Sequence, residues 1–420
     1  MTATPDGNAL AKLTFERYER YLNPGMAQLI AFMGFESVEV SSEGCYVYAS
    51  DGGRFLDCFG GPGVFSMGHR PPEIVARVRA QLEEMPLSSH IILDPVAAEL
   101  AERLAQVTPG DLRYSFLCNS GAEAVEGALK AARAFTGRPG FVSTIGGFHG
   151  KTFGALSASG REVYRTAFQP LLPGFTHVAF GDAEALEGAV SEQTAAVILE
   201  PIQGEAGIVV PPEGYLTRAR EICDAAGALL ILDEVQSGLA RTGRMWACDH
   251  EGVVPDIMTM GKALGGGVMP LAAFIARPEI WSIFAENPYI HSSTFGGNPM
   301  ACAAGLAALD FIEQHDLCTV AAERGAQMKA GFERIAAANP GMIEAVRGAG
   351  LLIGVQFSHE DIAGLMIAGL AGRRILAAYG LNNAATIRFE PPLIISEEQV
   401  DEVIEGFEEA LSKTAAMLEE

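Results

Sequence analysis

Apolar and polar positions follow two alternating periods through the middle of the chain. Short apolar runs, typical of buried strands, lie at 114–118, 177–180, 195–199, 228–232, 257–260 and 271–276. Between them, stretches such as 122–135 and 215–226 carry apolar residues at helical spacing. This alternation predicts a mostly parallel sheet covered by helices, which is an α/β fold.

Several helix ends are also marked in the sequence. Gly227 follows the stretch 215–226, and Pro109-Gly110 follows a helical pattern at 96–107. Near the C-terminus, 397–418 places its apolar residues on one face and its carboxylates elsewhere. We expect an amphipathic helix there, with the acidic side chains facing water.

The composition is that of a folded protein in water, because 49% of the 420 residues are hydrophobic and 19% are charged. This length fits two or three domains, or one large core with a smaller appendage. With 29 Lys and Arg against 52 Asp and Glu, the net charge is −23. Such a charge repels nucleic acids and anionic lipid surfaces, so we expect neither as a partner.

No apolar run approaches the ~20 residues that span a bilayer, and the first residues lack the pattern of a signal peptide. We therefore expect a cytoplasmic protein. The seven cysteines include no CxxC pair, and the eight histidines include no HxH or HxxxH pair. We expect reduced structural thiols and no metal site.

The segment 118–125, CNSGAEAV, joins a strand end to a helix start, and Ser120 and Glu123 have the spacing of a capping box. Free N–H groups at a helix N-terminus suit a phosphate, and Gly121 would let the backbone approach it. Most capping boxes only begin a helix, so this segment alone does not distinguish the two roles.

A glycine-rich segment at 146–152, GGFHGKT, contains two rings that could bind a flat ligand. Phe148 and His149 are the candidates, since an aromatic face stacks well on a heteroaromatic ring. A core phenylalanine beside a glycine-rich turn explains the same pattern equally well.

The apolar run 228–232 ends in two carboxylates, Asp233 and Glu234. Burying carboxylates there is costly unless a ligand uses their charge, and ligands of open α/β sheets gather at the carboxyl ends of the strands. Asp233 could begin a helix as its N-cap. Alternatively, it could hold a protonated ring nitrogen in its cationic form.

Lys262 lies in DIMTMGKALGGG, directly after a predicted buried strand and before a glycine-rich loop. Desolvation lowers the pKa of a lysine and supplies the neutral amine that forms a Schiff base. A phosphate turn, a stacking ring, a carboxylate for a pyridine nitrogen and such a lysine together describe a pyridoxal-phosphate site.

The chain resembles class III (ω-type) aminotransferases of pyridoxal-phosphate fold type I over nearly its whole length. The resemblance is carried by NSGAEAVEGALKAAR, FHGKT, EPIQGEAG, LDEVQSGLARTG, GKALGGG, STFGGNP and IRFEPPL. It implies a homodimer, with a large cofactor-binding domain at 60–310 and a smaller α+β domain built from 1–59 and 311–420. Within the family, CNSGAEAVEGALK, LLPGFTHVAFG, GGGVMPLAA and LNNAATIRFEPPL are most similar to putrescine aminotransferases.

The resemblance also implies a role for each matching residue. Lys262 would carry the cofactor and Asp233 would hold its ring nitrogen. The remaining cofactor contacts would be Ser120, Gly121 and Ala122 at the phosphate, Phe148 and Val235 on the two ring faces, His149 beside the ring, Gln236 at the ring hydroxyl, and Thr294 at the phosphate of the neighbouring subunit.

Two further residues concern the substrate. Arg388 would bind the carboxylate of an amino acid or oxo acid, since its planar guanidinium matches two oxygens. Glu205 would neutralise Arg388 when no carboxylate is bound. A structural ion pair for Arg388 and an exposed loop charge for Glu205 are the alternatives.

The expected activity is transfer of a terminal amino group from a diamine such as putrescine to 2-oxoglutarate, giving an aminoaldehyde and glutamate. Three alternatives stay open: a biosynthetic enzyme that aminates a long-chain or polyketide aldehyde, an acetylornithine or ornithine aminotransferase, and an aminomutase on the same fold. A non-catalytic dimeric scaffold would be expected to lose Lys262 or Asp233, and both are present.

Overall fold

The computed structural model describes residues 7–419 and contains one large sheet and two small ones. The large sheet has the strand order β4-β10-β9-β8-β7-β5-β6. Its strands are β4 (Tyr114–Cys118), β5 (Gly140–Thr144), β6 (Phe175–Val178), β7 (Thr194–Leu199), β8 (Leu229–Asp233), β9 (Ile257–Met260) and β10 (Ala272–Ala276). β10 runs opposite to the other six strands, which share one direction, so the predicted mostly parallel α/β sheet is confirmed.

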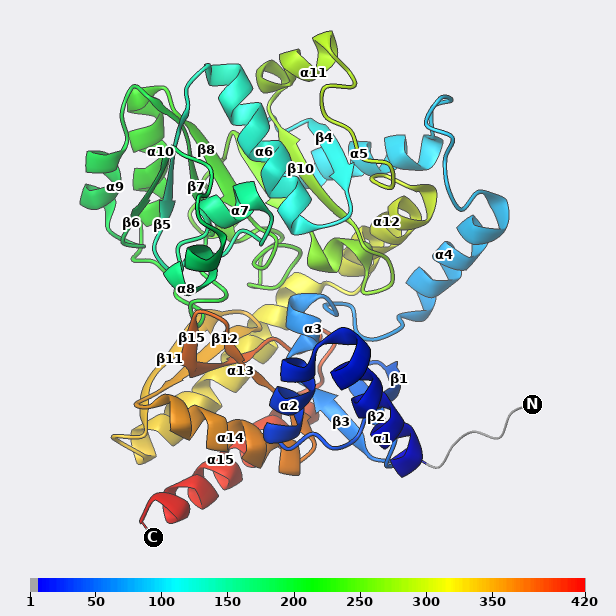
Figure 1. Cartoon of the computed structure of the whole chain (residues 1–420), viewed down its shortest axis with the longest axis vertical. Coiled ribbons are helices and arrows are strands. Elements are labelled where there is room, and N and C mark those ends of the chain that lie inside the picture. The colour runs from blue at the N-terminus through cyan, green and yellow to red at the C-terminus, as the bar shows by residue number, and fades with distance from the viewer. Residues whose placement is uncertain (1–6, 420) are drawn as a thin grey trace.

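Helices cover this sheet, as its buried strands require. Two long ones are α6 (Gly121–Thr136) and α10 (Tyr215–Ala226), which ends at the predicted Gly227 in a left-handed conformation. The other helices of the large-sheet region are α4 (Pro72–Glu84), α5 (Pro95–Val107), α7 (Phe153–Ala158), α8 (Glu162–Arg165), α9 (Ala183–Ala189), α11 (Ser282–Glu286) and α12 (Pro299–Gln314). Figure 1 shows them around the sheet in its upper half.

The two small sheets bring the chain ends together. One has the order β1-β2-β3-β13, formed by Glu39–Glu43, Tyr46–Ala49, Arg54–Asp57 and Ile375–Leu376. The other has the order β11-β12-β15-β14, formed by Ile343–Ala349, Leu352–Phe357, Asn383–Phe389 and Ala378–Gly380. Their helices are α1 (Gly7–Arg17), α2 (Pro24–Phe32), α13 (Leu317–Ala338), α14 (Glu360–Gly372) and α15 (Glu397–Glu419), in the lower half of Figure 1.

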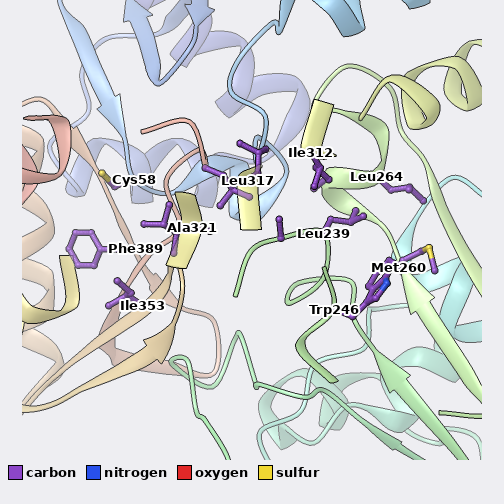
Figure 2. Packing of buried hydrophobic residues seen from close by; sticks show 14 of the residues in the cluster. Cys58, Leu239, Trp246, Met260, Leu264, Ile312, Leu317, Ala321, Ile353 and Phe389 are labelled. Atoms are coloured by element: carbon purple, nitrogen blue, oxygen red, sulfur yellow. The ribbon is translucent and has the colours of Figure 1, made fainter. Parts of the chain in front are cut away.

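One continuous hydrophobic core joins the large sheet to the small antiparallel sheet. Figure 2 shows Met260 and Trp246 from the first region and Ile353 and Phe389 from the second, with Leu317 and Ala321 of α13 among them. The two regions are therefore packed against each other over buried side chains. A domain division at residues 60 and 310 stays a prediction, and residue 310 lies inside α12.

None of the helices within residues 7–419 combines the length and apolar character needed to cross a membrane. The same residues include no group of three or more His, Cys, Asp or Glu side chains placed to hold a metal ion.

Candidate active site

A cavity of about 250 Å³ lies at the carboxyl ends of β7 and β8. It is lined by Gly121, Ala122, Phe148, His149, Gly150, Glu200, Glu205, Asp233, Val235, Gln236 and Lys262. Nine of the twelve residues predicted from the sequence are in this lining, although they come from segments spread over about 140 positions. Cavity volume alone does not locate the site, because a larger cavity of about 600 Å³ is lined by residues of α1, α2 and the segment 37–39.

The phosphate-binding candidates lie at the start of α6. Ser120 is its N-cap, and the Ser120 hydroxyl accepts a hydrogen bond from the Glu123 N–H at 3.3 Å while the Glu123 carboxylate accepts one from the Ser120 N–H at 2.9 Å. The predicted capping box is therefore present. A Cβ on Gly121 would lie only 2.9 Å from Val235, so a glycine is required for the helix start to approach the cavity wall. The first N–H groups of a helix lack partners within it and attract anions.

Asp233 ends β8 and is 4% exposed. One of its oxygens accepts a hydrogen bond from His149 Nδ1 at 2.7 Å, and the other accepts hydrogen bonds from the Thr259 hydroxyl at 3.0 Å and from the Val235 N–H at 3.2 Å. No helix begins at Asp233, so the N-cap alternative is wrong. These partners fix a buried carboxylate at the cavity wall, where a cationic ring nitrogen would stabilise its charge.

His149 and Glu200 form a second layer around Asp233. Burial works against a charged His149, but the hydrogen bond from its ring to Asp233 and the charge of Glu200 raise its pKa above the ordinary value. Burial raises the pKa of Glu200 to about 7, although His149 acts in the opposite direction. Glu200 accepts hydrogen bonds from the N–H groups of Phe148 at 2.9 Å and Gly204 at 3.1 Å, so it positions the loop that carries the predicted stacking ring.

Lys262 follows β9 at the cavity wall, with its backbone in the left-handed region at φ 46°. This conformation is costly for a residue with a side chain and is common at functional sites. Burial lowers the pKa of Lys262, and the charges of Glu390 and Glu205 act against this effect. A lowered pKa increases the fraction of neutral amine, which is the form that attacks an aldehyde.

Arg388 lies on β15 behind the cavity wall and is 1% exposed. Its Nη1 donates hydrogen bonds to Glu205 and to Glu390, both at 3.1 Å. Its Nε is buried and has no hydrogen-bond partner among the described residues. The ring of Phe59 lies under the guanidinium at 5.5 Å. The predicted Arg388–Glu205 pair is thus formed, and the guanidinium keeps donor capacity for a further acceptor.

Two buried carboxylates of this site were not predicted. Glu200 follows the buried run 194–199 directly, which is the same signal that identified Asp233. Glu390 is 0% exposed and contacts both Arg388 and Gln236. Its position two residues after Arg388, on the same face of an extended segment, is the only sequence signal for it.

Thr294 does not line this cavity. Its carbonyl oxygen accepts a hydrogen bond from the His90 ring at 2.8 Å, which ties together two segments with exposed apolar side chains. Leu93 is 96% exposed and Tyr289 is 83% exposed, and Ile91, Ile92 and Phe295 are exposed as well. Exposed apolar patches often mark sites of protein–protein interaction.

Comparison with known proteins shows the family of this chain. Residues 35–411 match the family model of class-III aminotransferases, so the chain belongs to this family. It is a transaminase of the pyridoxal-phosphate fold type I, and pyridoxal phosphate is its cofactor.

Solved structures of several transaminases are similar to this chain. An ornithine aminotransferase from Toxoplasma gondii, with partial occupancy of PLP at its active site, has 32% identity and a TM-score of 0.87, covering 92% of this chain and 91% of that one. An (S)-enantioselective ω-transaminase from Thermomicrobium roseum has 30% identity and a TM-score of 0.90, with 98% and 99% covered. An acetylornithine aminotransferase from Elizabethkingia anophelis has 31% identity and a TM-score of 0.79, with 92% and 98% covered.

The residues present fit this cofactor. An anion-binding helix start, a buried carboxylate and a lysine with a lowered pKa line one cavity, and each matches one part of the cofactor: its phosphate, its ring nitrogen and its aldehyde. When bound, pyridoxal phosphate supplies an electron-withdrawing ring that stabilises negative charge on the substrate carbon.

Proposed function

We propose that this enzyme transfers a terminal amino group from a diamine such as putrescine to 2-oxoglutarate. The observation that carries the proposal is the buried Arg388, paired with Glu205 at the cavity wall. A diamine has no carboxylate, so Glu205 stays on Arg388 while it binds. 2-Oxoglutarate replaces Glu205 with its own carboxylate, so one site serves both substrates.

The remaining roles in this proposal follow from the positions of the side chains. Lys262 holds the cofactor through Nζ and, when free, moves a proton at Nζ. Asp233 keeps the ring nitrogen protonated, while the N–H groups at Gly121 and Ala122 bind the phosphate. Phe148 and Val235 cover the ring faces, His149 orients Asp233, and Gln236 reaches the ring hydroxyl.

The second candidate is an ornithine or acetylornithine aminotransferase, because two of the similar structures are enzymes of these kinds. Ornithine also carries a terminal amino group, but it has a carboxylate that putrescine lacks. A third candidate aminates a long-chain or polyketide aldehyde. Purified holoenzyme with 2-oxoglutarate and a panel of putrescine, ornithine, acetylornithine and long alkyl amines separates the three by the rate of glutamate formation.

Removing the guanidinium of Arg388 is expected to affect the two half-reactions unequally. In Arg388→Gln, 2-oxoglutarate loses a charged contact worth about 3 kcal/mol, so its half-reaction should slow about 100-fold. The putrescine half-reaction loses no direct partner and should not slow, because the carboxylates of Glu205 and Glu390 remain in place. Single-turnover spectroscopy of each half, following the visible band of the cofactor, measures both rates.

Thermal melting serves as the control, because the substitution leaves Glu205 and Glu390 without their cation. Equal slowing of both half-reactions in a folded Arg388→Gln protein would show that Arg388 is structural.

We further propose a cytoplasmic homodimer in which Thr294 completes the neighbouring site. The exposed apolar side chains around the His90–Thr294 contact and the absence of Thr294 from its own cavity support the dimer. All seven cysteines are unpaired, as expected in a reducing compartment.

Mixing two inactive variants tests the shared site. A Lys262→Ala chain and a Thr294→Ala chain should regain part of the activity when mixed, because one site of the mixed dimer then carries both substitutions and the other carries neither. Each variant mixed with itself is the control. No recovery despite chain exchange shown by native mass spectrometry would contradict the proposal.

A further inference from the structure

Glu390 is a second carboxylate on Arg388, and unlike Glu205 it does not line the cavity. One Glu390 oxygen accepts the hydrogen bond from Arg388, and the other contacts the side-chain amide of Gln236. Its own N–H donates to the Cys58 carbonyl at 2.7 Å. The side chain is 0% exposed, so each oxygen has a fixed partner and none is left to water.

Residue 63 is a glycine, and because it has no side chain it leaves space for the contact between Glu390 and Gln236. A Cβ on Gly63 would lie 2.9 Å from the Glu390 carboxylate and 3.3 Å from the Gln236 amide. Glu205, in contrast, lines the cavity and lies in the turn between β7 and α10. Of the two carboxylates on Arg388, Glu205 is therefore the one that a substrate can replace.

The charges around Arg388 do not cancel. Two carboxylates contact the one guanidinium of Arg388, so these three side chains together carry a charge of −1 when Glu205 is paired, and Arg388 with Glu390 alone is neutral when Glu205 is displaced. The charge of Glu390 also acts on the buried Arg241 and on Lys262. A substrate carboxylate that binds Arg388 therefore always binds a guanidinium whose charge is already balanced by Glu390. A substrate ammonium meets one unbalanced negative charge in a buried site, where such charges interact strongly.

We propose that Glu390 determines the donor class of this site by permanently neutralising Arg388, so that donors with a distal ammonium are favoured over donors with a carboxylate. This inference rests on the proposed diamine activity, and it names the residue that makes the site prefer a diamine as the amino donor. Glu390 acts through Arg388 and Gln236 and is a specificity-determining residue rather than a catalytic one. The same charge raises the pKa of Lys262 against the effect of burial.

Glu390→Gln tests the charge with little change of shape, because the amide oxygen can accept from Arg388 and the amide NH2 can donate to the side-chain oxygen of Gln236 once that amide is turned over. Half-reactions of the holoenzyme are measured with putrescine, with glutamate and with n-butylamine, which has the same carbon chain as putrescine but no distal ammonium. We expect the second-order rate constant to fall about tenfold for putrescine and to rise about tenfold for glutamate, each change corresponding to about 1.4 kcal/mol. The n-butylamine reaction should stay within about threefold.

A binding measurement gives a second readout without turnover. Glutarate has the carboxylates of the oxo acid but no group that reacts, and calorimetry should show about tenfold tighter binding of glutarate to Glu390→Gln. Glu408→Gln removes an exposed carboxylate that pairs with Arg334 and should change none of these values. Glu390→Ala repeats the test if the glutamine variant is unstable by thermal melting.

The outcomes separate the two proposals. If the unmutated enzyme prefers putrescine but Glu390→Gln loses rate with all three donors together, Glu390 is structural and the inference is wrong. If the unmutated enzyme reacts with glutamate or ornithine and not with putrescine, the proposed diamine activity is wrong. Opposite changes for putrescine and glutamate, with unchanged n-butylamine, support both.

Discussion

Lys262→Ala protein is expected to lack the visible absorption of the bound cofactor and to lose turnover by about 10⁴-fold, the upper end of what a positioned proton-transfer group contributes. The substitution removes the only amine in the cavity lining, and with it both the covalent attachment and the proton carrier. Absorbance after reconstitution with pyridoxal phosphate and glutamate formation from 2-oxoglutarate measure the two losses.

The attachment itself can be located directly. Borohydride reduction of the unmutated holoenzyme followed by peptide mapping should place the adduct on Lys262. Lys151→Ala is a matched control, because Lys151 lies in the same 146–152 segment as Phe148 but its amine lies over the Tyr164 ring at 4.5 Å. An adduct on Lys151 or Lys130 would overturn the assignment.

Asp233→Ala is expected to keep the fold, and its turnover should fall about 100- to 1,000-fold. This is the size of effect seen when one buried polar group that faces the reacting centre is removed. Without the carboxylate, the ring nitrogen loses its proton more easily and accepts less charge from the substrate carbon. His149 also loses the partner that raises its pKa. Steady-state kinetics at saturating pyridoxal phosphate separates slower chemistry from weaker cofactor binding.

The adjacent carboxylate provides the control for this prediction. Glu234 is equally buried, but it contacts Ser237 and Cys248 instead of the cavity, and burial raises its pKa to about 7. Because a glutamine resembles the protonated form that is already populated near neutral pH, Glu234→Gln should retain most activity. Near-normal turnover of Asp233→Ala would contradict its role at the ring nitrogen.

The sequence predicted the large sheet well because the central strands β7, β8, β9 and β10 are buried on both faces and the edge strands β4 and β6 are also apolar runs. The apolar runs at 114–118 and 257–260 coincide with β4 and β9, and the run at 177–180 lies two residues after the start of β6 (Phe175–Val178). β5 (Gly140–Thr144) was missed, since a glycine, a serine and a threonine interrupt its apolar pattern. Tertiary packing buries its last four residues nevertheless.

Site residues that follow a strand were also accessible to sequence reasoning, because carboxyl ends of parallel strands share one edge. Asp233 and Lys262 are of this kind. Glu390 also follows a strand directly, but β15 belongs to the small antiparallel sheet. Its role depends on Gln236 and on the open space at Gly63, and no local pattern describes contacts with residues so distant in the chain.

The pairing of β3 with β13 has a consequence for the synthesis of this protein. The Leu56 N–H donates to the Arg374 carbonyl and the Cys58 N–H to the Leu376 carbonyl, so the segment next to α3 (Gly60–Gly63) has partners near the end of the chain. The strands of the large sheet all lie between residues 114 and 276 and leave the ribosome earlier. A nascent chain can therefore build the cofactor-binding face while its substrate side, including Arg388, is still being translated.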